Sequence, residues 1–308
     1  MHGPDGSATA VVVLHWGAAA DTLACLRSIA AAGFPARPLI VVDNGTGALA
    51  AGDVAAAAPG AELVRLDENR GYAGGNNAGI QRALDAGAAY VVLVNNDAVV
   101  DAACFDELVR VAVAGGPRLA AVGAKVLSAA EPGRLWMAYG RLTYRAALVE
   151  RVGAGEPDGP RYGVVRDADW VSGCVLLLTR PALQDIGLLD ERFFAYHEDV
   201  DWCTSARARG WRILFAPAAR VVHRGGGSLA ARGAARTVRY LSARNTVLFA
   251  RKHARPSDWL RLALTIGASL PREVFRPGAD RDDLRLLVRG YVDGLLGREP
   301  PYVALGLR

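Results

Sequence analysis

The chain has 308 residues and a mass of 32.4 kDa, of which 52% are hydrophobic and 22% charged. This composition excludes a disordered chain and allows one large domain or two small ones. No run of 18 apolar residues occurs, and the first residues, MHGPDGSATA, lack the basic and apolar regions of a secretory signal. We therefore expect a cytoplasmic protein, at most peripheral at the inner face of the membrane.

The net charge of +5 hides an asymmetry along the chain. Residues 1–231 contain 21 Lys and Arg against 24 Asp and Glu, a balance of −3, whereas residues 232–308 contain 15 against 7, a balance of +8. The four cysteines (Cys25, Cys104, Cys174 and Cys203) are far apart in the chain. This spacing disfavours a zinc finger or a disulfide scaffold and is typical of small buried side chains.

Strand and helix patterns alternate over the first hundred residues. Apolar runs predict strands at residues 10–14, 39–42, 62–66 and 90–94, with helices over 21–32, 48–58 and 74–86. Continuous apolar strands of this kind are typical of a mostly parallel sheet with helices on both faces, an α/β fold. Polar residues follow the second and fourth strands, at the edge where such sheets bind ligands.

The pattern loosens after residue 111. Glycines and prolines interrupt residues 111–168, and GAGEPDGPRYG at 153–163 predicts a surface loop. Strands are expected at 170–178 and 212–216, with a helix over 199–209 that ends at Gly210. From residue 230 onward the pattern is helical, with arginines at the polar positions.

Two polar segments of the first half have the chemistry to bind a nucleotide. Asp43 and Asn44 end the second strand, where a carboxylate accepts the imide N–H of uracil or thymine; a turn or a helix cap is the alternative. The segment NRGYAGGNNAG at 69–79 permits close backbone approach, and a helix start offers N–H groups to a diphosphate. It matches neither the dinucleotide nor the P-loop spacing, and a glycine-rich turn without function stays open.

Carboxylates and a histidine form the other candidate clusters. Asp97, in Asn95-Asn96-Asp97, has the chemistry to bind a divalent cation that bridges two phosphates, although an Asx turn explains it equally well. His223, in HRGGGS, has the chemistry to reach a metal or a phosphate, but a lone histidine is more often structural.

The acidic run EDVD at 198–201 follows the aromatic run FFAYH and begins a predicted helix. The helix dipole stabilises acidic groups there, and partial desolvation would tune the pKa of one carboxyl for general-base catalysis. A solvated acidic first turn is the alternative.

Together the motifs VVDN, NRGYAGGNNAG, VNND, W-x-SG, FFAYHEDVDWC and VVHRGGGS resemble, in order and spacing, the family 2 glycosyltransferases, in particular their bacterial rhamnosyltransferase-like branch. The resemblance covers about residues 10–250. It implies a GT-A fold, a nucleotide-diphosphate sugar donor, a divalent cation (Mg²⁺ or Mn²⁺) and inversion at the anomeric carbon.

The resemblance also implies roles for particular residues. Asp199, paired with Glu198, is the implied catalytic base, and Asp97 and His223 are the implied metal ligands. The implied nucleotide-sugar site comprises Asp43, Asn44, Asn69, Gly71, Asn76, Asn95, Asn96, Asp97, Trp170, Ser172 and Gly173. Three places depart from the family pattern. Asn95 stands where the family's DxD-type motif has its first acid, a departure common in this branch, and Ser205 stands where the family often has arginine, with Arg207 two residues on. The stretch His15-Trp16-Gly17 replaces an Asn-Tyr-Asn stretch.

On this basis we predict a catalytic domain over residues 1–230, with a nucleotide-binding half to about 110 and an acceptor half after it, followed by a basic helical extension over 231–308. The resemblance favours dTDP-rhamnose or another dTDP-sugar, with UDP and GDP donors open, and an acceptor hydroxyl on a glycan, a lipid-linked saccharide or a natural product. The extension fits an anionic lipid surface, a lipid-linked acceptor or a homodimer interface. Nucleic acid is not expected, because no recognition motif or aromatic platform occurs.

Three other functions compete with this interpretation. A nucleotidyltransferase acting on sugar phosphates would share the nucleotide and metal sites, but usually needs a basic residue near the reacting phosphate, and Lys125 is the only lysine in the first 251 residues. A glycoside hydrolase could use two carboxylates but has no need of the nucleotide features. An inactive sugar-nucleotide-binding module would be expected to lack Asp97 or Asp199, and both are present.

Overall fold

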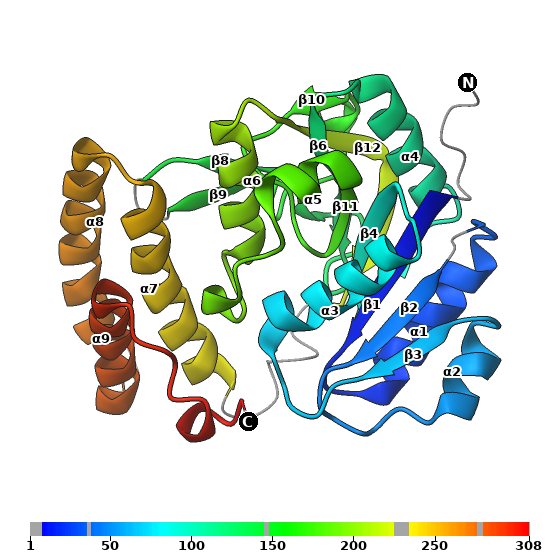
Figure 1. Cartoon of the computed structure of the whole chain (residues 1–308). Helices are drawn as coiled ribbons and strands as arrows, with labels where there is room; N and C mark the ends of the chain where they lie inside the picture. The colour runs from blue at the N-terminus through cyan, green and yellow to red at the C-terminus, as the bar shows by residue number, and fades with distance from the viewer. Residues whose placement is uncertain (1–7, 36–37, 145–147, 225–233, 276–279, 308) are drawn as a thin grey trace.

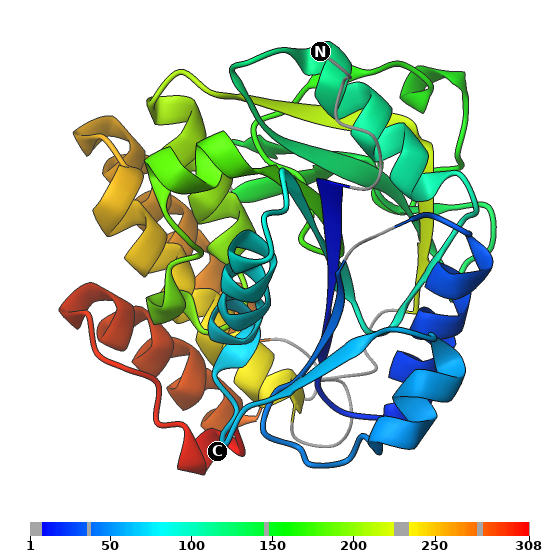
Figure 2. The same cartoon turned by 45° about the vertical axis from the view of Figure 1, so that its right-hand side comes forward.

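The computed structural model describes residues 8–35, 38–144, 148–224, 234–275 and 280–307. A mixed, mostly parallel sheet forms its centre, with strand order β10-β12-β6-β11-β4-β1-β2-β3 (Figures 1 and 2). In this order β10 and β11 alone run against the other strands. The strands are β1 (Thr9–His15), β2 (Leu39–Asp43), β3 (Glu62–Arg65), β4 (Tyr90–Asn95), β5 (Ala98–Val100), β6 (Leu119–Ser128), β7 (Leu135–Met137), β10 (Arg166–Asp167), β11 (Val175–Thr179) and β12 (Arg212–His223). A separate hairpin pairs β8 (Tyr139–Leu142) with β9 (Val149–Val152).

Helices cover both faces of the sheet because successive side chains of each strand point to opposite sides. Val12 and Leu14 of β1 join a core with α3 (Gly71–Asp85), α5 (Arg180–Ile186) and α6 (Glu198–Ala208). Val11 and Val13 join a second core with α1 (Ala19–Ala31), α2 (Ala51–Ala57) and α4 (Cys104–Gly115). The predicted α/β class is therefore confirmed.

Three C-terminal helices form a further layer on the left of Figure 1: α7 (Ala234–His253), α8 (Pro256–Val274) and α9 (Arg281–Leu296). Helix α7 lies between the α6 region and α9, against which it packs closely. Short 3-10 turns occur at Pro160–Tyr162, Glu191–Phe193 and Val303–Leu305. No helix in the described part of the chain is both long and apolar enough to span a bilayer.

The first hundred residues fold much as predicted. The four expected strands are β1 to β4, each within about two residues of its predicted bounds, and the three expected helices are α1 to α3. Helix α3 begins at Gly71 rather than at the expected residue 74. All four cysteines are buried and free, as expected.

The middle of the chain required the largest corrections. Residues 119–128, where the pattern seemed loose, form β6, a ten-residue strand in the centre of the sheet. This strand is buried on both faces, but its small residues and one lysine give it a weak apolar pattern in the sequence. The strand expected at 170–178 begins only at Val175, and the one expected at 212–216 continues to His223. Within the expected surface loop, Tyr162 is fully buried.

Candidate active site

The carboxyl ends of β1, β2 and β4 meet at one edge of the sheet. Because these strands are parallel neighbours, His15 lies beside Asp43, and Asn95 lies beside Leu14. The backbone N–H of Asn95 donates to the carbonyl of Cys174, 2.9 Å away. This contact joins the edge to the chain segment that contains Trp170, Ser172 and Gly173.

Asp43 is buried, and protein groups surround its carboxylate. Oδ1 accepts hydrogen bonds from the Thr46 backbone N–H at 3.0 Å and the Thr46 hydroxyl at 2.5 Å, and Oδ2 lies 3.0 Å from Nη1 of Arg65. Arg65 is half exposed. The turn expected as the alternative at Asp43 is therefore present, and a contact with a nucleobase stays a prediction.

Asn44 and Asn69 form a network that shapes the start of α3. The Asn44 amide donates to Asn69 Oδ1 at 2.9 Å and to the Gly71 carbonyl at 3.1 Å, and its oxygen accepts from the Arg70 N–H. Asn69 in turn donates to the carbonyl of Leu307, near the C-terminus, at 2.8 Å. The network places both asparagines at the expected sheet edge and links that edge to the end of the chain.

Glycines of the segment 69–79 serve packing within the protein. A Cβ on Gly75 or Gly79 would lie 2.4 Å or 2.3 Å from side chains of β1, so these glycines let α3 lie close to the sheet. Gly71 has φ +70°, and a Cβ there would lie 2.4 Å from the Phe194 carbonyl. We expected these glycines to let a ligand approach the backbone closely. At these three positions, other parts of the protein make the close approach instead. Asn76 is buried in the same helix, and its amide donates to the Tyr72 carbonyl.

Asp97 and His223 are brought together by the pairing of β5 with β12. Ala98 lies opposite His223 in that pairing, and Asp97 Oδ1 is 3.2 Å from His223 Nε2. Both side chains are buried, and the Trp136 ring packs against the imidazole nearly at right angles. Asn96, between β4 and β5, donates to the Trp16 carbonyl and the Thr22 hydroxyl. The glycine run of the HRGGGS motif lies outside the described residues.

This pair fits a divalent cation that takes only two ligands from the protein. A carboxylate oxygen and an imidazole nitrogen already lie side by side, which is a donor set suited to Mn²⁺ and less typical of Mg²⁺. Among the described residues no cluster of three or more His, Cys, Asp and Glu side chains could hold a metal. A cation at this pair would therefore take no more than two ligands from the His, Cys, Asp and Glu side chains of the described residues.

Asp199 stands at the start of α6 and is bound to the segment before β11. Its Oδ2 accepts the Gly173 N–H at 2.9 Å, and its Oδ1 accepts the Val200 N–H at 2.8 Å. The Tyr72 hydroxyl of α3 donates to the Gly173 carbonyl at 2.6 Å, so Gly173 is held from two sides. A Cβ on Gly173 would lie 2.5 Å from that hydroxyl, and therefore only glycine fits.

The carboxyl groups of Glu198 and Asp199 differ in how they are stabilised. Burial raises the pKa of both, and the nearby Asp199 carboxylate raises the pKa of Glu198 further. The two backbone N–H donors favour the ionised form of Asp199, which is half-buried, whereas Oε2 of Glu198 is buried without a partner among the described residues. We therefore assign the proton of this pair to Glu198 and the negative charge to Asp199.

Several buried polar atoms near this edge have no partner among the described residues. They are His15 Nε2, Asn76 Oδ1, Trp170 Nε1, Glu198 Oε2 and His223 Nδ1. Because buried polar groups are nearly always paired, such atoms mark places where a ligand or water would bind. His15 was not a predicted site residue; its only signal was the departure from the family pattern after the first strand. Of the other predicted residues, Trp170 packs against Gly140, and the Ser172 hydroxyl accepts the Cys174 N–H.

The loop before α6 depends on a residue that sequence reasoning missed. Phe194, Tyr196 and His197 all have positive φ angles, which residues other than glycine rarely adopt. Asn245 of α7 is fully buried, and its amide lies 2.8 Å from the carbonyls of Phe193, Ala195 and Tyr196. Asn245 therefore holds three carbonyls of the loop that precedes the carboxylate pair.

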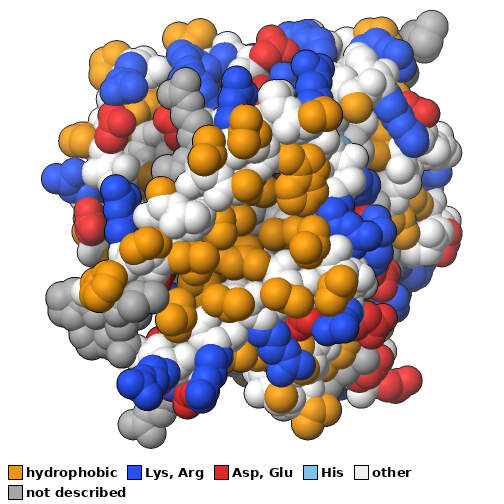
Figure 3. Space-filling model, turned by 90° about the vertical axis from the view of Figure 1, so that its left-hand side faces the viewer, with side chains coloured by type: hydrophobic (Ala, Val, Ile, Leu, Met, Phe, Trp, Pro, Cys, Tyr) orange, Lys and Arg blue, Asp and Glu red, His pale blue; other side chains and the backbone are white. Residues whose placement is uncertain are grey.

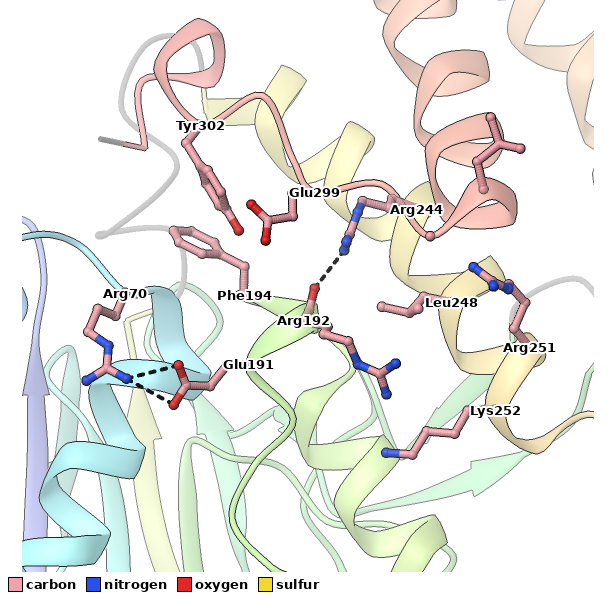
Figure 4. Close-up of a pocket in the computed structure, with 12 residues that line it drawn as sticks. Arg70, Glu191, Arg192, Phe194, Arg244, Leu248, Arg251, Lys252, Glu299 and Tyr302 are labelled. Carbon is pink, nitrogen blue, oxygen red and sulfur yellow. Dashed lines mark hydrogen bonds and ion pairs between the residues drawn. The ribbon is translucent and has the colours of Figure 1, made fainter.

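A cavity of about 670 Å³ lies between this loop, α7, α9 and the C-terminal segment (Figure 4). Its wall consists of Arg70, Glu191, Arg192, Phe194, Arg244, Leu248, Arg251, Lys252, Leu296, Gly297, Glu299 and Tyr302. Arg70 pairs with Glu191, whereas the buried Arg244 donates to the Arg192 and Arg298 carbonyls. The cavity is thus rich in cations and adjoins the loop held by Asn245.

Comparison with known proteins agrees with this geometry. The model of the family "Glycosyltransferase like family 2" matches residues 4–254. A 58-residue segment is 41% identical to N-acetylglucosaminyl-diphospho-decaprenol L-rhamnosyltransferase of Mycobacterium tuberculosis, and covers 19% of this chain and 19% of that protein. The chain thus matches only about a fifth of the length of that relative.

Solved structures with low sequence identity share the fold. A mannosyltransferase of Pyrobaculum calidifontis in complex with GDP-Man and Mn²⁺ has a TM-score of 0.57 at 18% identity, over 96% of this chain and 90% of that one. GalNAc-T7 with UDP, GalNAc and Mn²⁺ has a TM-score of 0.58 at 12% identity, over 94% and 56%. TarS of S. aureus has a TM-score of 0.54 at 12% identity, over 93% and 80%. With the family model covering most of the chain, these matches establish that the protein belongs to glycosyltransferase family 2 and has the GT-A fold.

Proposed function

We propose that this protein transfers a sugar from a nucleoside-diphosphate sugar to an acceptor hydroxyl, with inversion and with Asp199 as the general base. One observation carries the proposal. The backbone N–H of Asn95, in the Asn95-Asn96-Asp97 motif, donates a hydrogen bond to the Cys174 carbonyl, and the N–H of the adjacent Gly173 donates one to the Asp199 carboxylate. The residues proposed to hold the leaving diphosphate and the residue proposed to activate the acceptor are therefore linked by two hydrogen bonds.

In this mechanism Asp199 accepts the proton of the acceptor hydroxyl as its oxygen attacks the anomeric carbon. The bond from that carbon to the diphosphate breaks, and the nucleoside diphosphate leaves from the opposite face. General-base assistance of this kind contributes about 10²–10⁴-fold to the rate. Asp97 and His223 would hold a divalent cation, whose chemistry is to neutralise charge on the leaving diphosphate as a Lewis acid. The remaining residues proposed for the nucleotide sugar orient it at the sheet edge.

For the donor we propose a dTDP-sugar, with rhamnose or another deoxyhexose as the sugar. The support is the 58-residue similarity to an L-rhamnosyltransferase. UDP and GDP sugars are the alternatives, because GDP-Man and UDP are bound in structures of the same fold. The name of the same relative contains a diphospho-decaprenol, so a lipid-linked saccharide is the first acceptor to assay.

A nucleotidyltransferase is less well supported. The ammonium of Lys125 lies 2.7 Å from Asp158, which also pairs with Arg220, and so it is already engaged in an ion-pair cluster. The two reactions release different products: a nucleoside diphosphate from a sugar nucleotide, or pyrophosphate from a nucleoside triphosphate.

Calorimetry with dTDP, UDP and GDP, each with Mg²⁺ or Mn²⁺, tests the donor and metal assignments together. We expect the tightest binding for dTDP with Mn²⁺, and a loss of about 10–100-fold in metal-dependent affinity for Asp97→Ala. Unchanged affinity in that variant would remove Asp97 from the metal site. Pyrophosphate release from a nucleoside triphosphate and a sugar phosphate, without nucleoside diphosphate release from sugar nucleotides, would overturn the transferase proposal.

A further inference from the structure

Helices α8 and α9 expose large apolar side chains on the outer face of the C-terminal layer. Leu260 and Leu264 of α8 are 63% and 66% exposed. On α9 the exposed apolar side chains are Val288, Val292, Leu295 and Leu296. Figure 3 shows hydrophobic side chains gathered across the middle of this side of the molecule, with Lys and Arg side chains around much of the edge. We call this surface the α8–α9 face.

The spacing of these residues shows that the exposure is systematic. Leu260 and Leu264 are four residues apart, and Val288, Val292, Leu295 and Leu296 follow at intervals of four, three and one, so each set lies on one side of its helix. The opposite side of α9 is packed: a Cβ on Gly290 or Gly294 would lie 2.6 Å or 2.3 Å from carbonyls of α7. The exposed apolar side chains are therefore not needed for packing within the described structure, because α9 already packs against α7 through its other side.

Charged side chains of the two helices lie both on the side that faces α7 and on the outer side, where Asp282 is 63% exposed beside Arg285. Carboxylates turned toward α7 pair with its arginines, as Glu273 does with Arg239 at 2.6 Å. Outward arginines stay solvated: Arg261 and Arg285 are 61% and 79% exposed, each with one carboxylate contact in its own helix. The α8–α9 face thus combines an apolar centre with an outer fringe of arginine.

An apolar stripe fringed by arginine is the pattern of a helix that lies in the interface of an anionic bilayer. The apolar side chains enter the acyl boundary, while arginines contact lipid phosphates. A second copy of this chain is the competing occupant of the face, and the oligomeric state in solution distinguishes it from a bilayer. Nucleic acid fits less well because the centre of the face is apolar and the cations lie at its edge.

The α8–α9 face lies next to the cation-rich cavity. Leu296 is 54% exposed on the α8–α9 face and also lines the cation-rich cavity. Lys252, which also lines the cavity, pairs with Asp201 of α6, the helix that begins with the Glu198–Asp199 pair. A bilayer under the α8–α9 face would therefore lie beside this cavity, whose wall includes a residue paired with the helix that carries the Glu198–Asp199 pair.

We propose that the α8–α9 face docks this protein on the surface of an anionic phospholipid bilayer. The proposal rests on the exposed apolar stripes and the outward arginines, and it stands whether or not the protein transfers sugar. An anionic bilayer is required because the arginines bind phosphate charge, and the apolar stripes are required because charge alone would not hold the protein at high salt.

Cosedimentation of the full chain with vesicles tests the proposal. We expect binding to phosphatidylcholine vesicles that contain phosphatidylglycerol and at least about tenfold weaker binding to phosphatidylcholine alone. The double substitution Leu260→Asp with Leu264→Asp should lower binding to the anionic vesicles by at least about tenfold. Replacement of Arg261 and Arg285 by glutamine should lower it by about tenfold.

The matched control is Val113→Asp with Val164→Asp, which adds the same charge at side chains that are 47% and 61% exposed away from the α8–α9 face. This control should bind vesicles like the parent, and thermal unfolding should show that all variants are folded. Failure of the parent to bind anionic vesicles, or an equal loss in the control, would overturn the proposal. So would a dimer in sedimentation velocity that Leu260→Asp with Leu264→Asp disperses, because the face would then be a subunit interface. Donor binding by calorimetry reports separately on the proposed function.

Discussion

Helices α7 and α8 are neighbours in the chain, have 20 and 19 residues, and both belong to the basic last quarter of the sequence. Their surroundings are opposite. Helix α7 buries Tyr240, Asn245 and Phe249 completely, whereas Leu262 is the one buried residue among the described side chains of α8. Helix α7 carries five Lys and Arg and no Asp or Glu, whereas α8 carries two of each kind. The comparison shows that two consecutive helices of the basic last quarter differ in burial according to what packs against them.

The comparison also bears on the predicted domain boundary. A division after residue 230 assigns α7 to the C-terminal extension, yet Asn245 holds the loop before the carboxylate pair. Truncation at Tyr240 would therefore remove a support of the proposed active site together with α8 and α9. The boundary stays a prediction, and point substitutions separate the two helices better than truncation does.

The largest expected effect is at the carboxylate pair that α7 supports. Asp199→Asn should retain nucleotide binding and lose about 10²–10⁴-fold in turnover, because the amide cannot accept the acceptor proton. Glu198→Gln should stay within about tenfold of the parent, because glutamine resembles the protonated acid assigned to Glu198. Product formation under saturating donor measures both. The reverse order of effects would make Glu198 the base.

Next in size is the contrast between α7 and α8 themselves. Asn245→Leu removes the amide donor from the loop: the Phe193 carbonyl keeps the Ala195 N–H, whereas the Ala195 and Tyr196 carbonyls lose the Asn245 donor. We therefore expect a loss of about 3 kcal/mol in the free energy of unfolding and of about tenfold or more in kcat. Ser269→Ala on α8, which removes a hydrogen bond to the Ile266 carbonyl, should change the free energy of unfolding by less than about 0.5 kcal/mol. Denaturant unfolding and steady-state kinetics measure the pair, and equal effects would contradict the distinction between the helices.

The pH dependence of stability gives a smaller effect with a definite sign. Because burial raises the pKa of Glu198 above 4.5, the folded state holds this proton more tightly than the unfolded state does. Its contribution to stability is therefore present below about pH 4.5 and is lost as pH rises through the raised pKa. Glu198→Gln should remove this loss, so the stability of the variant relative to the parent should increase with pH.

The comparison of variant with parent matters here because His197 acts in the opposite direction. Burial lowers the pKa of His197 to about 4, so its contribution to stability is lost as pH falls from 6.5 toward that value. Unfolding curves of parent and variant from pH 4 to 8 cancel this common term. A constant difference across that range would mean that Glu198 keeps an ordinary pKa in the folded protein.

The smallest expected effect is on α8. Leu264→Asp should change the free energy of unfolding in solution by less than about 0.5 kcal/mol, since the side chain is 66% exposed and the fold gains little from it. Denaturant unfolding measures this directly. A loss of several kcal/mol would show that α8 is packed in solution as α7 is.

Much of the sheet and of the site was predictable from local sequence. The strands β1 to β4 are continuous apolar runs closed by polar residues, and parallel neighbours bring their carboxyl ends to one edge, so Asp43, Asn44 and Asn95 were expected there. Strand β6 was missed because its alanines and glycine carry little strand signal and its burial comes from neighbours far away in the chain.

The sequence by itself determined the family, the order of the motifs and of the first strands along the chain, and the candidate site residues. These could be predicted because motif spacing and apolar periodicity are local properties of the sequence. Only the tertiary structure decided which groups meet. The 3.2 Å contact of Asp97 with His223 depends on the pairing of β5 with β12, and the support of the loop before Asp199 depends on Asn245, nearly fifty residues later. The tertiary structure also decided the surroundings of the basic last quarter: packing against the loop before α6 and against α9 buries α7, whereas the stripes of α8 and α9 have no protein against them in the described structure. Net charge and composition are the same before and after folding, but burial depends on contacts between residues far apart in the chain.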